Sequence, residues 1–109
     1  MAHTPQLDLY AAQADAAYER ALEVRERLAR VTGTGTAARG DVRVTVGLGG
    51  RLTGVVIAGR ATELSGEALG AEIMTAASLA EQAAAREVHS VASTFYPDNE
   101  MWKHVTGEP

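Results

Sequence analysis

The longest pattern in the chain is a repeat of apolar residues spaced alternately three and four positions apart between residues 5 and 31. This spacing places one apolar seam along an α-helix and is typical of a coiled coil. Pro5 suits the first turn of such a helix, with Thr4 as its N-cap, and Gly33 follows as a stop signal. The seam consists of Leu7, Tyr10, Ala14, Ala17, Ala21, Val24, Leu28 and Val31.

This seam predicts that two copies of the chain associate as a homodimer. The stripe is longer than one small sheet can cover, and its central alanines would let a partner helix approach closely. Tyr18, Arg20, Arg25 and Arg27 flank the seam, at positions that select the partner in a coiled coil. The alternative is that the same face packs on the protein's own sheet. We expect the seam to form at least part of the dimer interface.

Between residues 32 and 58 the pattern changes to an alternation of period two, which predicts β-strands. Residues 32–36 alternate threonine with glycine and predict a weak edge strand. Residues 42–46 alternate valine with polar side chains, the pattern of a half-buried strand. Arg39-Gly40 is predicted as the turn between them, and a glycine-rich turn leads into a third strand over residues 51–58.

The length of that second turn follows from the faces of the two strands it joins. A two-residue turn, Gly49-Gly50, would place Arg51 and Thr53 on the face of the valines. A slip of one residue inverts a strand, so the register with a coherent apolar face should be preferred. We therefore predict a three-residue turn, Leu48 to Gly50, closed by a left-handed glycine. In this register Val46 opposes Leu52, Val44 opposes Gly54 and Val42 opposes Val56, and one face buries Val42, Val44, Val46, Leu52 and Val56.

A second helix is predicted from Ser65 to about residue 92. Ser65 is a suitable N-cap, and Glu67 lies in the first turn, where the helix dipole favours an acid. The apolar stripe of this helix is Leu69, Ile73, Ala76, Ala80, Ala84, Val88 and Val91. The resulting class is α+β, in the order α-β-β-β-α. We assign residues 1–92 to one domain and expect residues 93–109 to be a flexible or loosely docked tail, whose Phe95, Tyr96 and Trp102 contact a hydrophobic surface.

The net charge of the chain is −4, but basic and acidic residues are concentrated in different parts of the sequence. Residues 18–60 hold eight arginines and four acidic residues, whereas residues 61–109 hold eight acidic residues and two basic ones. Arginine binds phosphate and carboxylate groups in a planar, bidentate geometry. The basic segment therefore predicts an anionic partner, although a genome rich in arginine codons would also explain the preference for arginine over lysine.

The sequence carries no signature of an enzyme or of a cofactor site. There is no cysteine, and the three histidines are far apart without a metal-spaced partner. Gly33 and Gly35 follow a helix and precede a strand, whereas a phosphate-binding loop follows a strand and opens a helix. No apolar run is long enough to span a membrane, and residues 1–8 do not form a signal peptide. We expect a cytoplasmic, non-enzymatic protein without metal, cofactor or small-molecule substrate.

The order of elements and several short motifs resemble the YbaB/EbfC family of nucleoid-associated proteins. The resemblance runs from Val31-Thr32-Gly33 through residues 40–46 and 50–57 into Leu69, Ile73 and the alanines that follow them, about two thirds of the chain. The family's Asp-Pro after the third strand is replaced here by Gly59-Arg60, and the aromatic tail also departs from the family pattern. The resemblance implies a homodimer that binds double-stranded DNA with low sequence selectivity and acts in nucleoid organisation or gene regulation.

Two functions follow from these observations. In the first, the protein binds duplex DNA through phosphate contacts made by arginines of the basic segment. In the second, it is a protein–protein adaptor or chaperone-like factor, for example in secretion, as the acidic second half and the aromatic tail would suit. Some helix arginines are also spaced for ordinary ion pairs, such as Arg30 with Glu26. The predicted DNA-binding residues are Arg20, Arg25, Arg27, Arg30, Arg39, Arg43 and Arg51.

Overall fold

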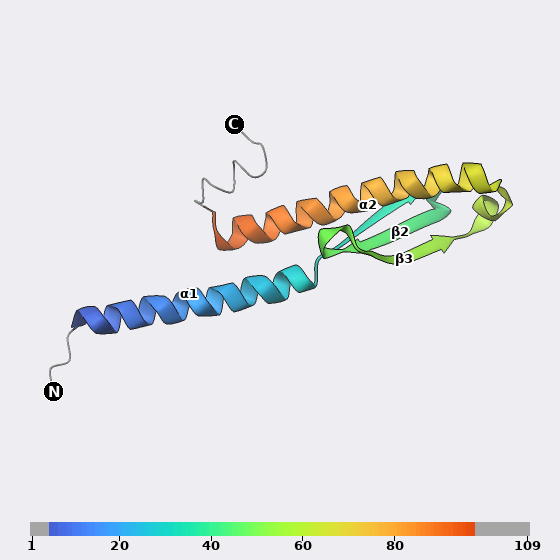
Figure 1. Ribbon diagram of the computed structural model, residues 1–109. Helices are drawn as coiled ribbons and strands as arrows, with labels where there is room; N and C mark the ends of the chain where they lie inside the picture. Colours follow the sequence, from blue (N-terminus) through green and yellow to red (C-terminus); the bar gives the residue numbers. More distant parts are fainter. Residues whose placement is uncertain (1–4, 98–109) are drawn as a thin grey trace.

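The computed structural model describes residues 5–97 and shows the predicted α+β order of elements (Figure 1). Helix α1 is followed by three strands and a second long helix, and the chain is elongated, with a longest dimension of 78 Å. Helix α1 ends two residues before the predicted Val31, and α2 continues three residues beyond the predicted end near residue 92. The elements are α1 (Pro5–Ala29), β1 (Thr32–Ala37), β2 (Val42–Gly47), β3 (Leu52–Ile57) and α2 (Gly66–Phe95).

The three strands form one antiparallel sheet in the order β1-β2-β3, and α2 lies across one of its faces. Helix α2 makes its main contacts with β1 and β2, so β3 is left largely uncovered. Ser65 caps α2 as predicted, because its hydroxyl oxygen accepts a hydrogen bond from the Ala68 amide at 3.2 Å. The opposite face of the sheet carries no helix among the described residues.

The glycines of β1 allow α2 to lie directly on the strand. A Cβ atom added to Gly33 would overlap the carbonyl oxygen of Ala80, and one added to Gly35 would overlap that of Ala76. The alternation of threonine and glycine in β1 therefore serves packing: the glycines face the helix and the threonines face solvent. Small residues on both elements bring the two backbones together.

The core lies between this helix and the sheet. The alternating valines of β2 are fully buried, as their pattern predicted, and burial of one valine contributes roughly 1.5–3 kcal/mol. The core also includes Val31, which lies between α1 and β1. Its buried members are Val31, Val42, Val44, Val46, Ala61, Ala76, Ala80 and Ala84.

The turn from β2 to β3 has the predicted length, but the register beyond it differs from the prediction. The loop is Leu48–Gly50, with Gly49 in the left-handed conformation at φ 74°, and Val46 opposes Leu52 as predicted. A β-bulge next to Val46 then shifts the pairing by one residue, so that Val44 opposes Val55 and Val42 opposes Ile57. The bulge turns Val56 to the other face of the sheet.

Burial of Leu52 and Val56 was therefore predicted wrongly. Leu52 is 59% exposed and Val56 is 56% exposed. Val56 lies on the open face, opposite Arg43, because of the bulge. Leu52 keeps the predicted partner, but α2 does not extend over β3 to cover it.

Candidate functional site

Helix α1 projects from the sheet and offers most of its surface to solvent (Figure 1). Every described side chain from Leu9 to Glu23 is exposed. Along the predicted seam, Tyr10 is 70% exposed and the three central alanines are exposed as well. Val24 and Leu28 are half-buried, Val31 lies in the chain's own core, and the side chain of Leu7 lies outside the described residues. The seam is thus open over its first half and partly covered over its second.

A hollow of about 450 Å³ lies beside the second half of the seam. Ala21, Val24 and Leu28 of α1 form one wall, and Leu48 and Tyr96 line the remainder. A second hollow of about 590 Å³ begins on the other side of Leu48 and follows α2 past Ala84 and Val88. Leu48, which is 48% exposed, therefore separates two open apolar depressions.

The aromatic end of α2 contacts α1. The Arg20 guanidinium lies 5.8 Å from the centre of the Tyr96 ring, and the Arg27 guanidinium lies 5.8 Å from that of Phe95. Cation–π contacts at this separation are favourable by about 0.5–1 kcal/mol at exposed sites. The tail was expected to begin at residue 93, but Phe95 is the last residue of α2, and the two rings contact arginine guanidinium groups rather than the expected hydrophobic surface. Trp102 lies outside the described residues.

The other predicted arginines of α1 lie near its C-terminal end. Arg30 forms an ion pair with Glu26 at 4.0 Å, and both side chains are highly exposed. Arg25 lines the 450 Å³ hollow. The ordinary helix ion pair weighed from the sequence is therefore present at Arg30, and such exposed pairs contribute at most about 1 kcal/mol.

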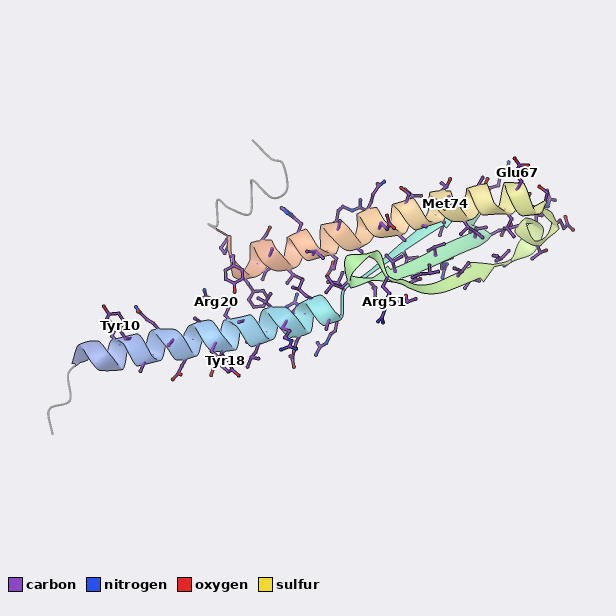
Figure 2. The ribbon with its side chains drawn as sticks, viewed as in Figure 1. Tyr10, Tyr18, Arg20, Arg51, Glu67 and Met74 are labelled. Atoms are coloured by element: carbon purple, nitrogen blue, oxygen red, sulfur yellow. The ribbon has the colours of Figure 1, made fainter. Side chains whose placement is uncertain are left out.

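The three predicted arginines of the strands and turns lie at different places. Arg39 lies in the turn between β1 and β2, with φ at +59°, and Arg43 projects from the open face of the sheet. Arg51 precedes β3 and points away from α2, as Figure 2 shows. The structure therefore groups the seven arginines into an α1 set, a sheet set and a distal turn rather than into one cluster.

On β1 and β2 the open face of the sheet is polar and carries no acidic side chain. Thr34 and Thr45 face each other across β1 and β2, with their hydroxyl oxygens 3.5 Å apart. Thr36 lies opposite Arg43 in the next row. None of the three strands contains an aspartate or glutamate. Hydroxyl and guanidinium donors on a flat surface are suited to contacts with phosphate oxygens.

Two acidic residues of α2, Glu67 and Glu72, lie away from this open face. Glu67 projects from the far end of α2, on the side opposite to Arg51 (Figure 2). Glu72 faces inward, where its carboxylate accepts a hydrogen bond from the Ala38 amide at 3.0 Å. Glu81, by contrast, lies close to Gly50, next to Arg51.

Strand β3 is an apolar surface that the sequence pattern did not indicate. It is one of the two edge strands of the sheet, and Leu52, Val55 and Val56 are all more than one third exposed. Gly54 was the available signal, because a glycine inside a strand often marks a bulge. An uncovered apolar edge strand is a surface on which another chain can pair.

Within residues 5–97, no three histidine, cysteine, aspartate or glutamate side chains are grouped so that they could hold a metal ion. No helix in the same region is long and apolar enough to cross a membrane. A sequence model described as the YbaB/EbfC DNA-binding family matches residues 4–98. No curated protein matches the chain.

Proposed function

The chain belongs to the YbaB/EbfC DNA-binding family, a nucleoid-associated family, and on this premise we propose that it is a homodimer that binds double-stranded DNA with low sequence selectivity. Its role would be nucleoid organisation or gene regulation in the cytoplasm, without catalysis. The observation that carries the proposal is the match to the family over residues 4–98, which includes every described residue.

The open face of the sheet and the C-terminal end of α1 supply the DNA contacts in this proposal. Arg43 and Arg51, with the threonines of β1 and β2, present donors to phosphate oxygens, and exposed Arg30 adds a cation near the start of the sheet. Contacts to phosphate fix position but carry no sequence information. A dimer would present each arginine twice, which raises affinity for a polyanion without requiring a net positive charge.

Low selectivity is tested by competition between two unrelated duplexes of equal length. The protein is bound to a labelled duplex and displaced by either unlabelled competitor at the same salt concentration. We expect the two competitors to be equally effective, with affinities in the range typical of nonspecific binding, Kd on the order of 10⁻⁴–10⁻⁶ M at physiological salt. Displacement by only one of them would show that the protein reads base sequence.

The homodimer is supported by the exposure of α1. Most of the stability of a helix in a protein comes from packing of its apolar face, and the seam of α1 from Tyr10 to Ala21 is exposed in the single chain, which favours a partner. The seam alanines Ala14, Ala17 and Ala21 are exposed, and their small side chains would allow another helix to approach closely. A second copy offers the same seam and is the simplest partner.

The variant Ala21→Glu should therefore weaken association by several kcal/mol if the seam is desolvated in the dimer, because it buries an unpaired charge. The fold of the single chain should be unaffected, since Ala21 is exposed there. Ala12→Glu, which places the same charge at an exposed position outside the seam, is the matched control. Sedimentation equilibrium measures both. Equal dimerisation constants for the two variants would show that the seam is not part of the dimer interface.

A protein–protein adaptor is the second candidate function. The observation that favours it is the pair of apolar hollows on either side of Leu48, which can receive apolar side chains of another protein. In that case the protein would retain its partner in the presence of competing duplex, and the arginines of the sheet would not affect binding.

A further inference from the structure

We propose that the segment after Pro97 folds back along α2 and that its Trp102 docks in the 590 Å³ hollow beside Leu48. Three features carry this proposal: the reach of the segment from the end of α2, the shape and lining of the hollow, and the charge at the far end of the hollow. The proposal rests neither on the homodimer nor on DNA binding.

Helix α2 ends where the sequence favours a reversal of the chain. Tyr96 leaves the helical conformation, with ψ at +61°, although its amide still donates a hydrogen bond to the Ala92 carbonyl oxygen at 2.8 Å. The next three residues are Pro97, Asp98 and Asn99. Proline favours the second position of a β-turn, and aspartate and asparagine are frequent turn residues. A turn at this point would return the chain toward the body of α2.

The segment has the length needed to place Trp102 in the hollow. Val88, which lines the hollow, lies eight residues before Tyr96, about 12 Å back along the helix axis at 1.5 Å per residue. Trp102 lies three residues after Asn99, and an extended chain covers roughly 10 Å in three residues. The two lengths agree to within the reach of a side chain.

The hollow lies on the side of α2 from which the segment departs. Ala85 and His89 line it, and they lie eleven and seven residues before Tyr96, so the three side chains share one side of the helix. Ala84 and Ala85 are small and leave room above the helix, while Leu48 lines the hollow from the hairpin loop. An indole ring suits such a site, because it buries more apolar surface than a smaller side chain.

Charge complementarity supports the same direction of the chain. Glu81 lines the end of the hollow that lies farther from Tyr96. Lys103, the only lysine of the chain, directly follows Trp102, so a segment that runs back along α2 brings it toward Glu81. An exposed ion pair contributes little stability. The indole ring therefore supplies most of the binding, and the ion pair fixes the position of the segment along the helix.

This docking assigns the hollow to the chain itself rather than to another protein. A partner in the adaptor function would have to displace Trp102 or bind at the 450 Å³ hollow on the other side of Leu48.

Trp102 is the only tryptophan of the chain, so its fluorescence reports on this segment alone. The full chain is compared with Ala85→Arg, which fills the hollow from an exposed position, and with Ala71→Arg, which makes the same change on α2 outside the hollow. Circular dichroism confirms the fold of each variant. We expect acrylamide to quench the wild-type chain and Ala71→Arg several-fold less than free N-acetyltryptophanamide, and to quench Ala85→Arg almost as strongly as that reference.

A charge reversal tests the position of the segment separately. Lys103→Glu and Glu81→Lys should each increase quenching, because each places like charges together. The double variant should restore the protection of the wild-type chain, which a general effect of either substitution on the fold would not do.

Protection that persists on dilution and in the Ala21→Glu chain would support docking within one chain. Protection lost on dilution would place Trp102 on a second copy and would overturn the proposal. Quenching of the wild-type chain equal to the reference, unchanged protection in Ala85→Arg, or a double variant without restored protection would also overturn it. None of these readouts depends on DNA, so their failure would leave the proposed DNA binding in place.

Discussion

A Gly35→Val chain should lose most or all of its folding stability. An added Cβ at this position would overlap the carbonyl oxygen of Ala76, and it would also crowd the Ala80 amide and the Leu79 side chain. An extra methyl or methylene group in a packed core usually lowers the free energy of unfolding by about 1–3 kcal/mol. Here the clash is with backbone atoms, which cannot rotate away. We therefore expect the free energy of unfolding to fall by an amount at or above the upper end of that range. Small domains have only about 5–15 kcal/mol of stability in total.

The matched control is Gly54→Ala, which adds a side chain to β3 at a position where an added Cβ meets nothing within 4 Å. It should fold normally, and denaturant unfolding followed by circular dichroism compares the two variants. A Gly35→Val chain as stable as the control would show that α2 does not lie directly on β1.

Reversing the charge of Arg30, Arg43 and Arg51 together should abolish most duplex affinity. These three side chains are exposed and lie just after α1, on the open sheet face and at the hairpin end, respectively. If each contacts one phosphate, a dimer loses six contacts, and at about 0.9 per neutralised phosphate the log–log salt slope should fall by about 5. Fluorescence anisotropy with a labelled duplex at several salt concentrations measures both quantities.

Single substitutions distinguish the loss of specific phosphate contacts from the effect of a lower net charge. Arg43→Glu lies on the open face of the sheet, whereas Arg86→Glu makes the same change on the exposed surface of α2. We expect a clear loss of affinity for Arg43→Glu and little change for Arg86→Glu. Equal losses would mean that net charge, rather than a defined surface, determines binding. Unchanged affinity of the triple variant would favour the adaptor function.

The helices and the central strand could be predicted because their patterns are local. The three-four spacing predicts the helix α1, and the alternation of Val42, Val44 and Val46 predicts a strand with one side facing the core, from residues close together in the sequence. The three-residue turn could be derived as well, since only that length places Val46 opposite Leu52. These features are decided by residues that lie close together in the sequence.

The exposure of β3 could not be predicted because it depends on tertiary packing. The close fit of α2 onto Gly33 and Gly35 places the helix over β1 and β2, which leaves Leu52 uncovered although its register is correct. The bulge also moves the Val56 side chain to the other face of the sheet. A shift of one residue cannot be recognised in an apolar run such as Val55-Val56-Ile57, because either register places an apolar side chain on each face. A strand that is apolar on both faces is ambiguous without its partner.

The candidate site was predictable in residue type but not in arrangement. Arginine enrichment indicated an anionic partner, yet the sequence did not show that Arg20 and Arg27 contact aromatic rings at the end of α2. These contacts join residues far apart in the chain. The alternation of residues 42–46 did place Arg43 and Thr45 together on the polar side of the strand, but that this face stays open depends on α2 covering the other face.

The measurement that tests the proposed function most directly is the affinity of the wild-type chain for duplex DNA as a function of salt concentration. Titration of a labelled duplex at several potassium chloride concentrations should give log K falling linearly with log salt, with a slope of about −0.9 for each phosphate neutralised, and the same line for a second duplex of unrelated sequence. An absence of binding at low salt, or an affinity that does not change with salt, would contradict the proposal that this chain binds the DNA backbone.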